Sequence, residues 1–302
     1  MASGLAIITD RTIGLELELV IPIVGEGTNL DVQRLIADIL TRQGISACAR
    51  PYSQQPVPEG HLFCVEHDSS LRDETRFAGI RWAKLEVKGK PMQWPEMERV
   101  VPGALEILQY LGCRVNTSTG LHVHHHLPEI IETPQVARNL AHLWFRIHKV
   151  VYGLLPPSRC NNQYCWPPQL SDASRFDRIK SYGALCQELN RCDRYQGLNF
   201  TNLTNRQRLT VEWRAHSGSL DWAKIRAWIL ATQRWTEHAL GRSCHLKAGP
   251  LPNTRPGLNA LLLSTGLKPN SRIYQKVQPE LRAVGRYLLK RWKQVNQPSR
   301  SA

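Results

Sequence analysis

The stretch that decides the fold alternates polar and apolar residues and reads Gly120-Leu121-His122-Val123-His124-His125-His126. In a β-strand, successive side chains point to opposite faces. His122, His124 and His126 therefore share one face, whereas Val123 and His125 point the other way. Imidazoles in a row on one strand face can ligate a metal ion or contact phosphate oxygens. The alternative is a surface strand whose histidines have no function.

Two other stretches repeat this geometry. In the first, Glu16 and Glu18 share one face, and in the second Glu212, Arg214 and His216 do so. Carboxylates and imidazoles on one sheet face suit one or two divalent cations, and an arginine among them suits a phosphate. Alternating charge on a single strand is usually a solvated face, but three such strands far apart in the sequence favour a common site. The stretches are Ile13-Gly14-Leu15-Glu16-Leu17-Glu18-Leu19-Val20 and Leu209-Thr210-Val211-Glu212-Trp213-Arg214-Ala215-His216.

These segments belong to an ordered set that runs from Thr12 to Leu240. In this set the chain resembles the amidoligase family, relatives of the carboxylate–amine ligases glutamine synthetase and glutamate–cysteine ligase. The matching segments are Gly14-x-Glu16-x-Glu18, Asp68-x-Ser70-Leu71, the strand around Glu86, Val115-Asn116, Gly120 to His124, Ser158 to Cys165, Tyr195 to Asn199, Thr210 to Arg214, and Gly218 to Asp221 with Trp228.

The resemblance implies an ATP-dependent ligase that forms an amide or peptide bond through an acyl phosphate, with Mg²⁺ as the metal and Mn²⁺ as a substitute. It implies two metal positions, one held by Glu16, His122 and Glu212 and one by Glu18 and Glu86. As catalytic residues it implies Arg214, His124 and Arg159 beside the phosphates or the substrate, and Asp68 in a turn at the rim of the active site. The remaining positions expected to contact ATP or substrate are Lys88, Asn116, His126 and Asn199, of which His126 is chosen by strand periodicity alone.

The sequence departs from the family pattern just after Glu86. The family usually has Ser-Pro there, and this chain has Lys88-Gly89-Lys90-Pro91. We expect these lysines to contact phosphate or an acidic substrate, although lysines of this kind also occur on solvated edge strands. Arg159 has a similar alternative, since it lies in a proline-containing segment where an arginine can be an exposed loop charge.

Composition limits the classes of function. The chain has 302 residues, a formal net charge of +14 and a pI of about 9.7, which favours anionic partners such as nucleotides, acidic substrates or nucleic acid. No apolar run approaches the roughly 20 residues that a membrane helix needs. The first ten residues show no secretion signal, so we expect a cytoplasmic protein without a membrane partner. None of the eight cysteines forms C-x-x-C, and we expect reduced thiols rather than a zinc knuckle.

The pattern of strands and helices predicts an α+β fold with a curved, mainly antiparallel sheet flanked by helices. The resemblance makes this sheet similar to the catalytic domain of glutamine synthetase. We expect a catalytic domain over residues 1–245. Residues 246–302 are expected to form a proline-containing linker and a basic helical extension that packs on it. One amphipathic helix is predicted over 171–190.

Two other functions remain open at this stage. A metal-dependent hydrolase would use the same histidines and glutamates with an activated water, although the glutamate-rich set with Arg214 points more to nucleotide phosphates. A basic nucleic-acid-binding protein fits the charge, but no zinc-finger, RNP or helix-turn-helix signature supports it. The acid, the amine and the oligomeric state are not indicated by the sequence.

Overall fold

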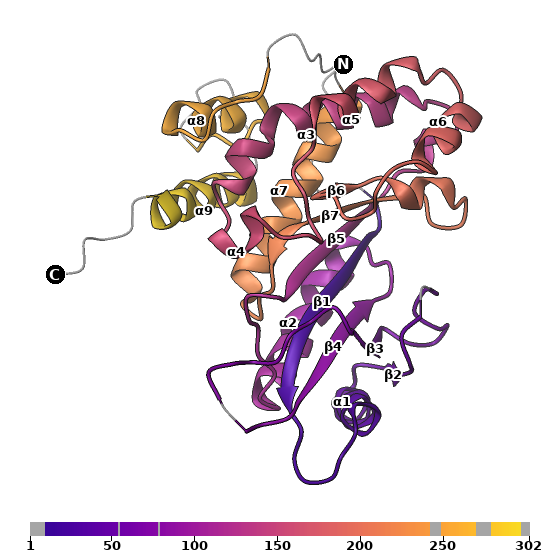
Figure 1. The fold of residues 1–302 in the computed structure, drawn as a ribbon, viewed down its shortest axis with the longest axis vertical. Helices are drawn as coiled ribbons and strands as arrows, with labels where there is room; N and C mark the ends of the chain where they lie inside the picture. The colour runs from indigo at the N-terminus through magenta and orange to yellow at the C-terminus, as the bar shows by residue number, and fades with distance from the viewer. Residues whose placement is uncertain (1–9, 54, 78, 242–248, 270–278, 297–302) are drawn as a thin grey trace, which may run out of the picture. The chain divides into compact units, whose positions relative to one another are not determined.

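The computed structural model describes residues 10–53, 55–77, 79–241, 249–269 and 279–296. Within these residues, seven strands form one sheet in the order β2-β3-β4-β1-β5-β7-β6, with helices flanking it (Figure 1). The predicted α+β class is confirmed, whereas the curved, mainly antiparallel character of the sheet and its likeness to glutamine synthetase stay predictions. The strands are β1 (Ile13–Pro22), β2 (Ala47–Ala49), β3 (Phe63–His67), β4 (Trp82–Gly89), β5 (Gly120–His126), β6 (Leu198–Asn199) and β7 (Thr210–Ser217).

The chain divides into two compact units. The strand unit comprises residues 10–124 and 216–225, and the helical unit comprises residues 125–215 and 226–302 within the described ranges. The predicted boundary between 245 and 246 falls in residues 242–248, outside the described residues, and stays a prediction. The helices are α1 (Asn29–Arg42), α2 (Trp94–Tyr110), α3 (Gln135–Tyr152), α4 (Pro157–Cys160), α5 (Leu170–Arg175), α6 (Tyr182–Leu189), α7 (Trp222–Gly241), α8 (Arg255–Ser264) and α9 (Pro279–Asn296), with 3-10 turns at Pro128–Ile130, Phe176–Arg178 and Thr201–Thr204.

In the strand unit, the alternating sequence of β1 gives the strand one apolar face and one polar face. Leu15, Leu17 and Leu19 are at most 2% exposed and form the apolar face of the strand. β1 pairs antiparallel with β4, β4 pairs antiparallel with β3, and β3 pairs parallel with the edge strand β2. Helix α1 packs against β2 and β3 and begins at a capping box in which Thr28 and Asp31 exchange hydrogen bonds. This leaves the other face of β1 and β4 to the polar side chains.

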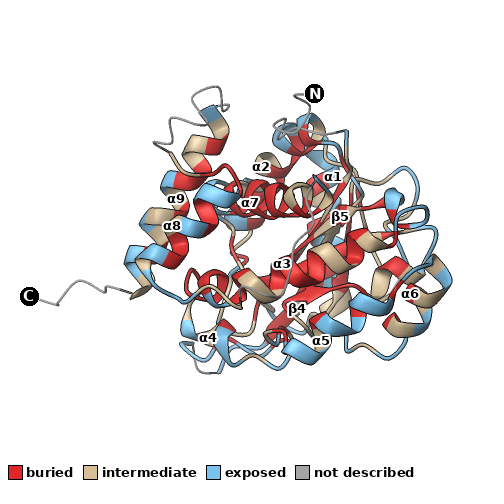
Figure 2. Cartoon of the chain, turned by 90° about the horizontal axis from the view of Figure 1, so that it is seen from above, coloured by how far each residue is buried: buried red, intermediate tan, exposed pale blue. Residues whose placement is uncertain are grey.

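In the helical unit, an aromatic core joins β7 to the helices. Trp213 makes an edge contact with Trp144 of α3 at 5.5 Å between ring centroids, and Trp235 of α7 lies 5.5 Å from it on another side. The Trp213 indole N–H donates to Thr236 at 3.2 Å. Helix α3 is buried along most of its length, whereas α5 is largely exposed (Figure 2). One face of β7 is thus fixed by packing, and Glu212 and Arg214 lie on the alternate positions.

The C-terminal helix α9 packs within the helical unit. Arg291 donates to the carbonyl of Leu154 at 3.1 Å, and Asn296 donates to that of Gly153 at 2.7 Å. The indole N–H of Trp292 donates to Asn253 at 2.8 Å. These bonds tie α9 to the end of α3 and to the residues before α8.

The single helix predicted over 171–190 is wrong. The structure has α5, a 3-10 turn and α6, with Ile179 in an extended conformation between them. Ser181 then caps α6, because its hydroxyl accepts from the Ala184 N–H at 3.2 Å. A serine at an N-cap competes with continuation of the preceding helix.

Among the described residues, none of the helices is both long enough and apolar enough to cross a lipid bilayer.

Candidate metal centre

Carboxylates from three neighbouring strands of the strand unit form a row. The strand register places Glu86 of β4 directly opposite Glu18 of β1 on one side and Glu66 of β3 on the other. All three side chains are buried, with 7% exposure for Glu86, 6% for Glu18 and none for Glu66. Because directly paired residues lie on the same face of a sheet, alternating strand sequences converge here on one acidic row.

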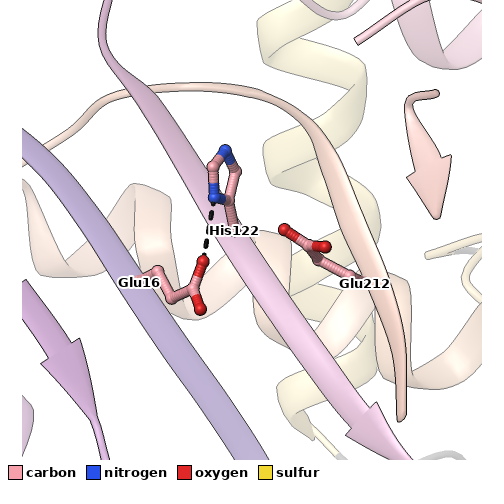
Figure 3. Close-up of side chains that lie close together, drawn as sticks. All are labelled: Glu16, His122 and Glu212. Atoms are coloured by element: carbon pink, nitrogen blue, oxygen red, sulfur yellow. Dashed lines mark hydrogen bonds and ion pairs between the residues drawn. The ribbon is translucent and has the colours of Figure 1, made fainter. Parts of the chain in front are cut away.

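His122 of β5 joins two members of this row. One ligand atom each from Glu18, Glu86 and His122 lie within 4.8 Å of one another. His122 Nε2 is 3.3 Å from Glu18 Oε1. His122 Nδ1 is 3.1 Å from Glu16 Oε2, the contact drawn as a dashed line in Figure 3. The Gly120 N–H also donates to the Glu18 carboxylate. Two carboxylates and an imidazole in this proximity are a donor set suited to a divalent cation.

His124 lies next to this group, as the alternation of β5 predicts. Its Nε2 is 3.2 Å from Glu16 Oε1. The approach depends on Gly14, since a Cβ at that position would lie 3.2 Å from the Cβ of His124. The glycine of the Gly14-x-Glu16-x-Glu18 segment therefore has a steric role, because a side chain there would require His124 to shift.

The electrostatics of the cluster differ from one carboxylate to the next. Burial raises the pKa of the Glu86 carboxyl well above its usual range, and the charges of Glu16 and Glu18 raise it further. Burial acts in the same direction on Glu16, but contacts with His124 and His122 outweigh it and hold the pKa of Glu16 well below its usual range. The face thus carries an ionised Glu16 beside a Glu86 whose charge is disfavoured.

Lys88 lies inside the acidic row. Its Nζ is 2.8 Å from Glu66 Oε2 and 3.0 Å from Glu86 Oε2, and it donates to the Ser53 carbonyl at 2.7 Å. Although burial opposes it, the charges of Glu86 and Glu16 raise the pKa of Lys88 above its usual value. In this structure the partners of Lys88 are therefore these carboxylates and the Ser53 carbonyl. The predicted contact of Lys88 with ATP or substrate stays a prediction.

Asp68 and Asn116 shape turns in the strand unit. Asp68 follows β3 and accepts a hydrogen bond from the Ser70 N–H at 2.8 Å. Asn116 accepts from the Ser118 N–H at 2.9 Å and donates to the Arg72 carbonyl at 2.9 Å. Both side chains hold backbone in the turns that flank the strands, and their roles toward a ligand stay predictions.

In the helical unit, Glu212 and Arg214 form a buried pair on β7. Glu212 is 3% exposed and Arg214 5%, and the Arg214 guanidinium donates to Glu212 Oε1. Asn199 of β6, which lies opposite Glu212 in the antiparallel pairing, donates to Glu212 Oε2 at 2.8 Å. Arg214 also donates to the Tyr164 carbonyl at 3.3 Å. Both oxygens of Glu212 are therefore oriented before any ligand binds.

Arg159 is buried at 2% exposure, which excludes the exposed loop charge considered above. Its guanidinium donates to the Arg214 carbonyl at 2.7 Å and to the Ala215 carbonyl at 3.3 Å. It therefore supports the backbone of β7, and its predicted contact with nucleotide or acyl phosphate stays a prediction.

His126 is half-buried at the end of β5. Its neighbour His125 contacts Thr232 of α7 at 2.9 Å, which agrees with the predicted alternation.

Comparison with protein families identifies the family of this chain. The family model described as "Putative amidoligase enzyme" matches residues 9–236. The chain belongs to this family. The suspected relationship to the amidoligases is thereby confirmed.

Comparison with individual proteins adds less to the amidoligase assignment. No curated protein matches the sequence. A solved structure, the complex between prokaryotic ubiquitin-like protein Pup and its ligase PafA, is similar at a TM-score of 0.38 and 12% sequence identity. The match covers 98% of this chain and 65% of that chain. A likeness this low carries no argument about the activity of the present amidoligase.

Sequence reasoning missed one residue of the acidic row, Glu66. Glu66 accepts hydrogen bonds from Arg50 Nε at 2.7 Å and from the Ser53 N–H at 2.8 Å, in addition to its ion pair with Lys88. The stretch Phe63-Cys64-Val65-Glu66-His67 gives little signal, because Glu66 follows three apolar residues and lacks the polar–apolar alternation seen around Glu16. No motif of the amidoligase pattern draws attention to it, and only the register of β3 with β4 brings it into the row.

Proposed function

We propose that this amidoligase is an ATP-dependent carboxylate–amine ligase that acts through an acyl phosphate on the carboxylate of an amino acid, a peptide or a protein. The observation that carries the proposal is the group formed by Glu18, Glu86 and His122, whose ligand atoms lie within 4.8 Å of one another, in a chain of this family. The net charge of +14 supports anionic substrates such as a nucleotide and an acidic carboxylate.

The chemistry explains why such a site is needed. A carboxylate is a poor acylating agent because its oxygen leaves badly. Transfer of the γ-phosphoryl group of ATP to a carboxylate oxygen gives an acyl phosphate and ADP. The amine nitrogen then attacks the acyl carbon, inorganic phosphate leaves with that oxygen, and the amine loses a proton. The first step brings two anions together and the second releases an anionic phosphate, so catalysis requires the reacting groups to be held in place and their charge neutralised.

The residues of the cluster fit a divalent cation. Carboxylate oxygens and a neutral imidazole are suitable donors, and a cation would offset the burial and the neighbouring negative charges that raise the pKa of Glu86. Glu18 and Glu86 would hold one metal ion, and the family pattern assigns Glu16, His122 and Glu212 to a second. Mg²⁺ at these positions would supply neutralisation of the phosphate charge.

The remaining roles belong to side chains of the chain itself. Arg214 would contact the phosphoryl group as it moves, since a planar guanidinium offers several donors to phosphate oxygens. Asn199 would keep Glu212 oriented through the hydrogen bond to Oε2. His124, paired with Glu16, would lie beside the phosphates. Because these groups are fixed by packing before the substrates arrive, little reorganisation accompanies the reaction.

The test is release of ADP and phosphate from ATP with Mg²⁺, measured against pools of amino acids, peptides and amines, with product masses determined by mass spectrometry. Glu212→Gln is the inactive variant. Glu188→Gln is the matched control, because it makes the same change at a surface pair, where Glu188 lies 3.5 Å from Arg175. We expect ADP release that rises with one acid, is lost in Glu212→Gln and persists in Glu188→Gln.

Two results would contradict the proposal. ADP release that does not depend on any acid or amine, with no amide product, would indicate simple nucleotide hydrolysis. Cleavage of an amide or ester without ATP would indicate a metal-dependent hydrolase.

A further inference from the structure

Lys88 occupies an unusual position for a lysine next to a metal site. It lies on the same strand face as Glu86 and points toward Glu66, so that it bridges two carboxylates that face each other across β3 and β4. Its side chain is 13% exposed, and the Tyr52 ring lies 5.2 Å from its ammonium group. Lys88 is thus enclosed rather than projecting into solvent.

The hydrogen bonds of Lys88 are fully used. An ammonium group has three N–H donors and no acceptor. Here it contacts the Ser53 carbonyl at 2.7 Å, Glu66 at 2.8 Å and Glu86 at 3.0 Å. No N–H is left over for a phosphate or a substrate carboxylate unless one of these contacts breaks.

The charged side chains on the polar face of β1, β3 and β4 indicate the role of Lys88. The carboxylates of Glu16, Glu18, Glu66 and Glu86 line this face. Arg50 and Lys88 both form ion pairs with Glu66, and Lys88 also pairs with Glu86. Arg50 binds Glu66 from the loop after β2. The Lys88 ammonium therefore lies where the facing carboxylates would otherwise bind an additional divalent cation.

We propose that Lys88 is a built-in counter-ion that limits the affinity and the number of divalent cations bound beside Glu86, and that Glu66 is the positioning residue that holds Lys88 there. Lys88 pairs with Glu86 Oε2 at 3.0 Å, so a cation held by Glu18 and Glu86 would share the Glu86 carboxylate with an ammonium group. This inference rests on the proposed function only for the presence of that cation site, and it assigns Lys88 a role other than contact with ATP.

The proposal makes opposite predictions for the two partners. Lys88→Gln removes a positive charge and frees an oxygen of Glu86 together with Glu66. Partly buried charges a few ångströms apart interact strongly, so divalent cations should then bind at least about tenfold more tightly, or at one additional site. Glu66→Gln removes a negative charge and leaves Lys88 with Glu86 alone, so cations should bind at least about threefold more weakly. A purely structural role would weaken binding in both variants.

A matched control lies on the same strand. Lys84 is two residues from Glu86 on the other side and shares its face, but it pairs with Asp73 at 3.1 Å and is 29% exposed. Lys84→Gln makes the same chemical change without touching Glu66 or Glu86. Its binding of cations should stay within about threefold of the wild type, because exposed charges are screened by water and salt.

The experiment is a titration of the full chain with Mn²⁺ alone, without nucleotide, in which free Mn²⁺ is counted by electron paramagnetic resonance. Tighter binding or an additional site in Lys88→Gln, with weaker binding in Glu66→Gln, supports the proposal. Equal or weaker binding in Lys88→Gln overturns it. If Lys88→Gln does not fold, Glu66→Gln decides, and equal or tighter binding there overturns the proposal.

This titration separates the inference from the proposed function. Binding of Mn²⁺ by the wild type with no gain in Lys88→Gln overturns the role of Lys88 and leaves the ligase proposal intact. Binding by Lys88→Gln alone supports the role of Lys88 even if the wild type is inactive with ATP. Absence of binding in every variant overturns the role of Lys88 and also removes the metal site from the proposed function.

Discussion

Gly218 tests how the turn before β5 supports the proposed metal ligands, because there is no room for a side chain at this position. A Cβ at this position would lie 2.3 Å from Thr119 Oγ1 and 2.8 Å from Thr119 Cβ, whereas ordinary contacts begin at 3.4 Å. Gly218→Ala therefore requires Thr119 or the backbone at Gly218 to move by about 1 Å, since 3.4 − 2.3 = 1.1 Å. Overpacking of this kind costs typically 1–3 kcal/mol, and we expect a loss of about 2 kcal/mol in the free energy of unfolding.

The displacement would also reach the metal ligands. Thr119 accepts from the Asn116 N–H at 3.1 Å and donates to the Asn116 carbonyl at 2.9 Å, so it fixes the turn before β5. The Gly218 N–H donates to the Thr119 carbonyl at 2.8 Å, and the next residue, Gly120, donates to Glu18. We therefore expect Gly218→Ala to weaken Mn²⁺ binding at least about threefold in addition to lowering stability.

Chemical denaturation measures the stability and Mn²⁺ titration measures the binding. Gly183→Ala is the control, since nothing lies within 4 Å of its Cβ position in α6, and it should be neutral or stabilising by up to about 1 kcal/mol. Thr119→Ala should reduce the cost of Gly218→Ala in a double-mutant cycle, because it removes the closest atom. An unfolding free energy of Gly218→Ala within about 0.5 kcal/mol of the wild type would refute the steric argument.

Other predictions address separate parts of the chain. Arg214→Lys should lose ATP turnover while its circular dichroism stays native, because one ammonium cannot replace the contacts to Glu212 and the Tyr164 carbonyl; an unchanged rate would remove Arg214 from the chemistry. Trp292→Phe should lower the free energy of unfolding by about 1 kcal/mol through loss of the hydrogen bond to Asn253, as measured in urea, and an unchanged midpoint would show that this bond contributes nothing. Burial raises the pKa of the Cys113 thiol to about 12, so at pH 8 almost no thiolate forms in the folded protein and alkylation of Cys113 should require denaturant; mass spectrometry that finds rapid labelling of Cys113 in the native protein would contradict its burial.

The local patterns of the sequence predicted the strands and their faces. Alternation in β1, β5 and β7 placed Glu16 with Glu18, His122 with His124, and Glu212 with Arg214, because the period of a strand is fixed by its own backbone. The same reasoning placed His125 on the opposite face, where it contacts Thr232. Local signals were insufficient between 171 and 190, where the cap at Ser181 starts a second helix.

The partners of buried charges depended on contacts between distant segments. No feature of the sequence near Arg159 shows that its guanidinium donates to the backbone of β7, more than 50 residues away. Glu66 and Glu86 lie on separate strands, and the register between them decides that they face each other with Lys88 between.

The sequence by itself determined which residues could ligate a metal and which face of each strand they occupy, since both follow from residue type and strand period. Only the tertiary structure decided that Glu66 completes the acidic row and that Lys88 is enclosed by carboxylates. The physical reason is that a buried ammonium and a buried carboxylate are stable only when they find partners, and those partners are set by how the strands align.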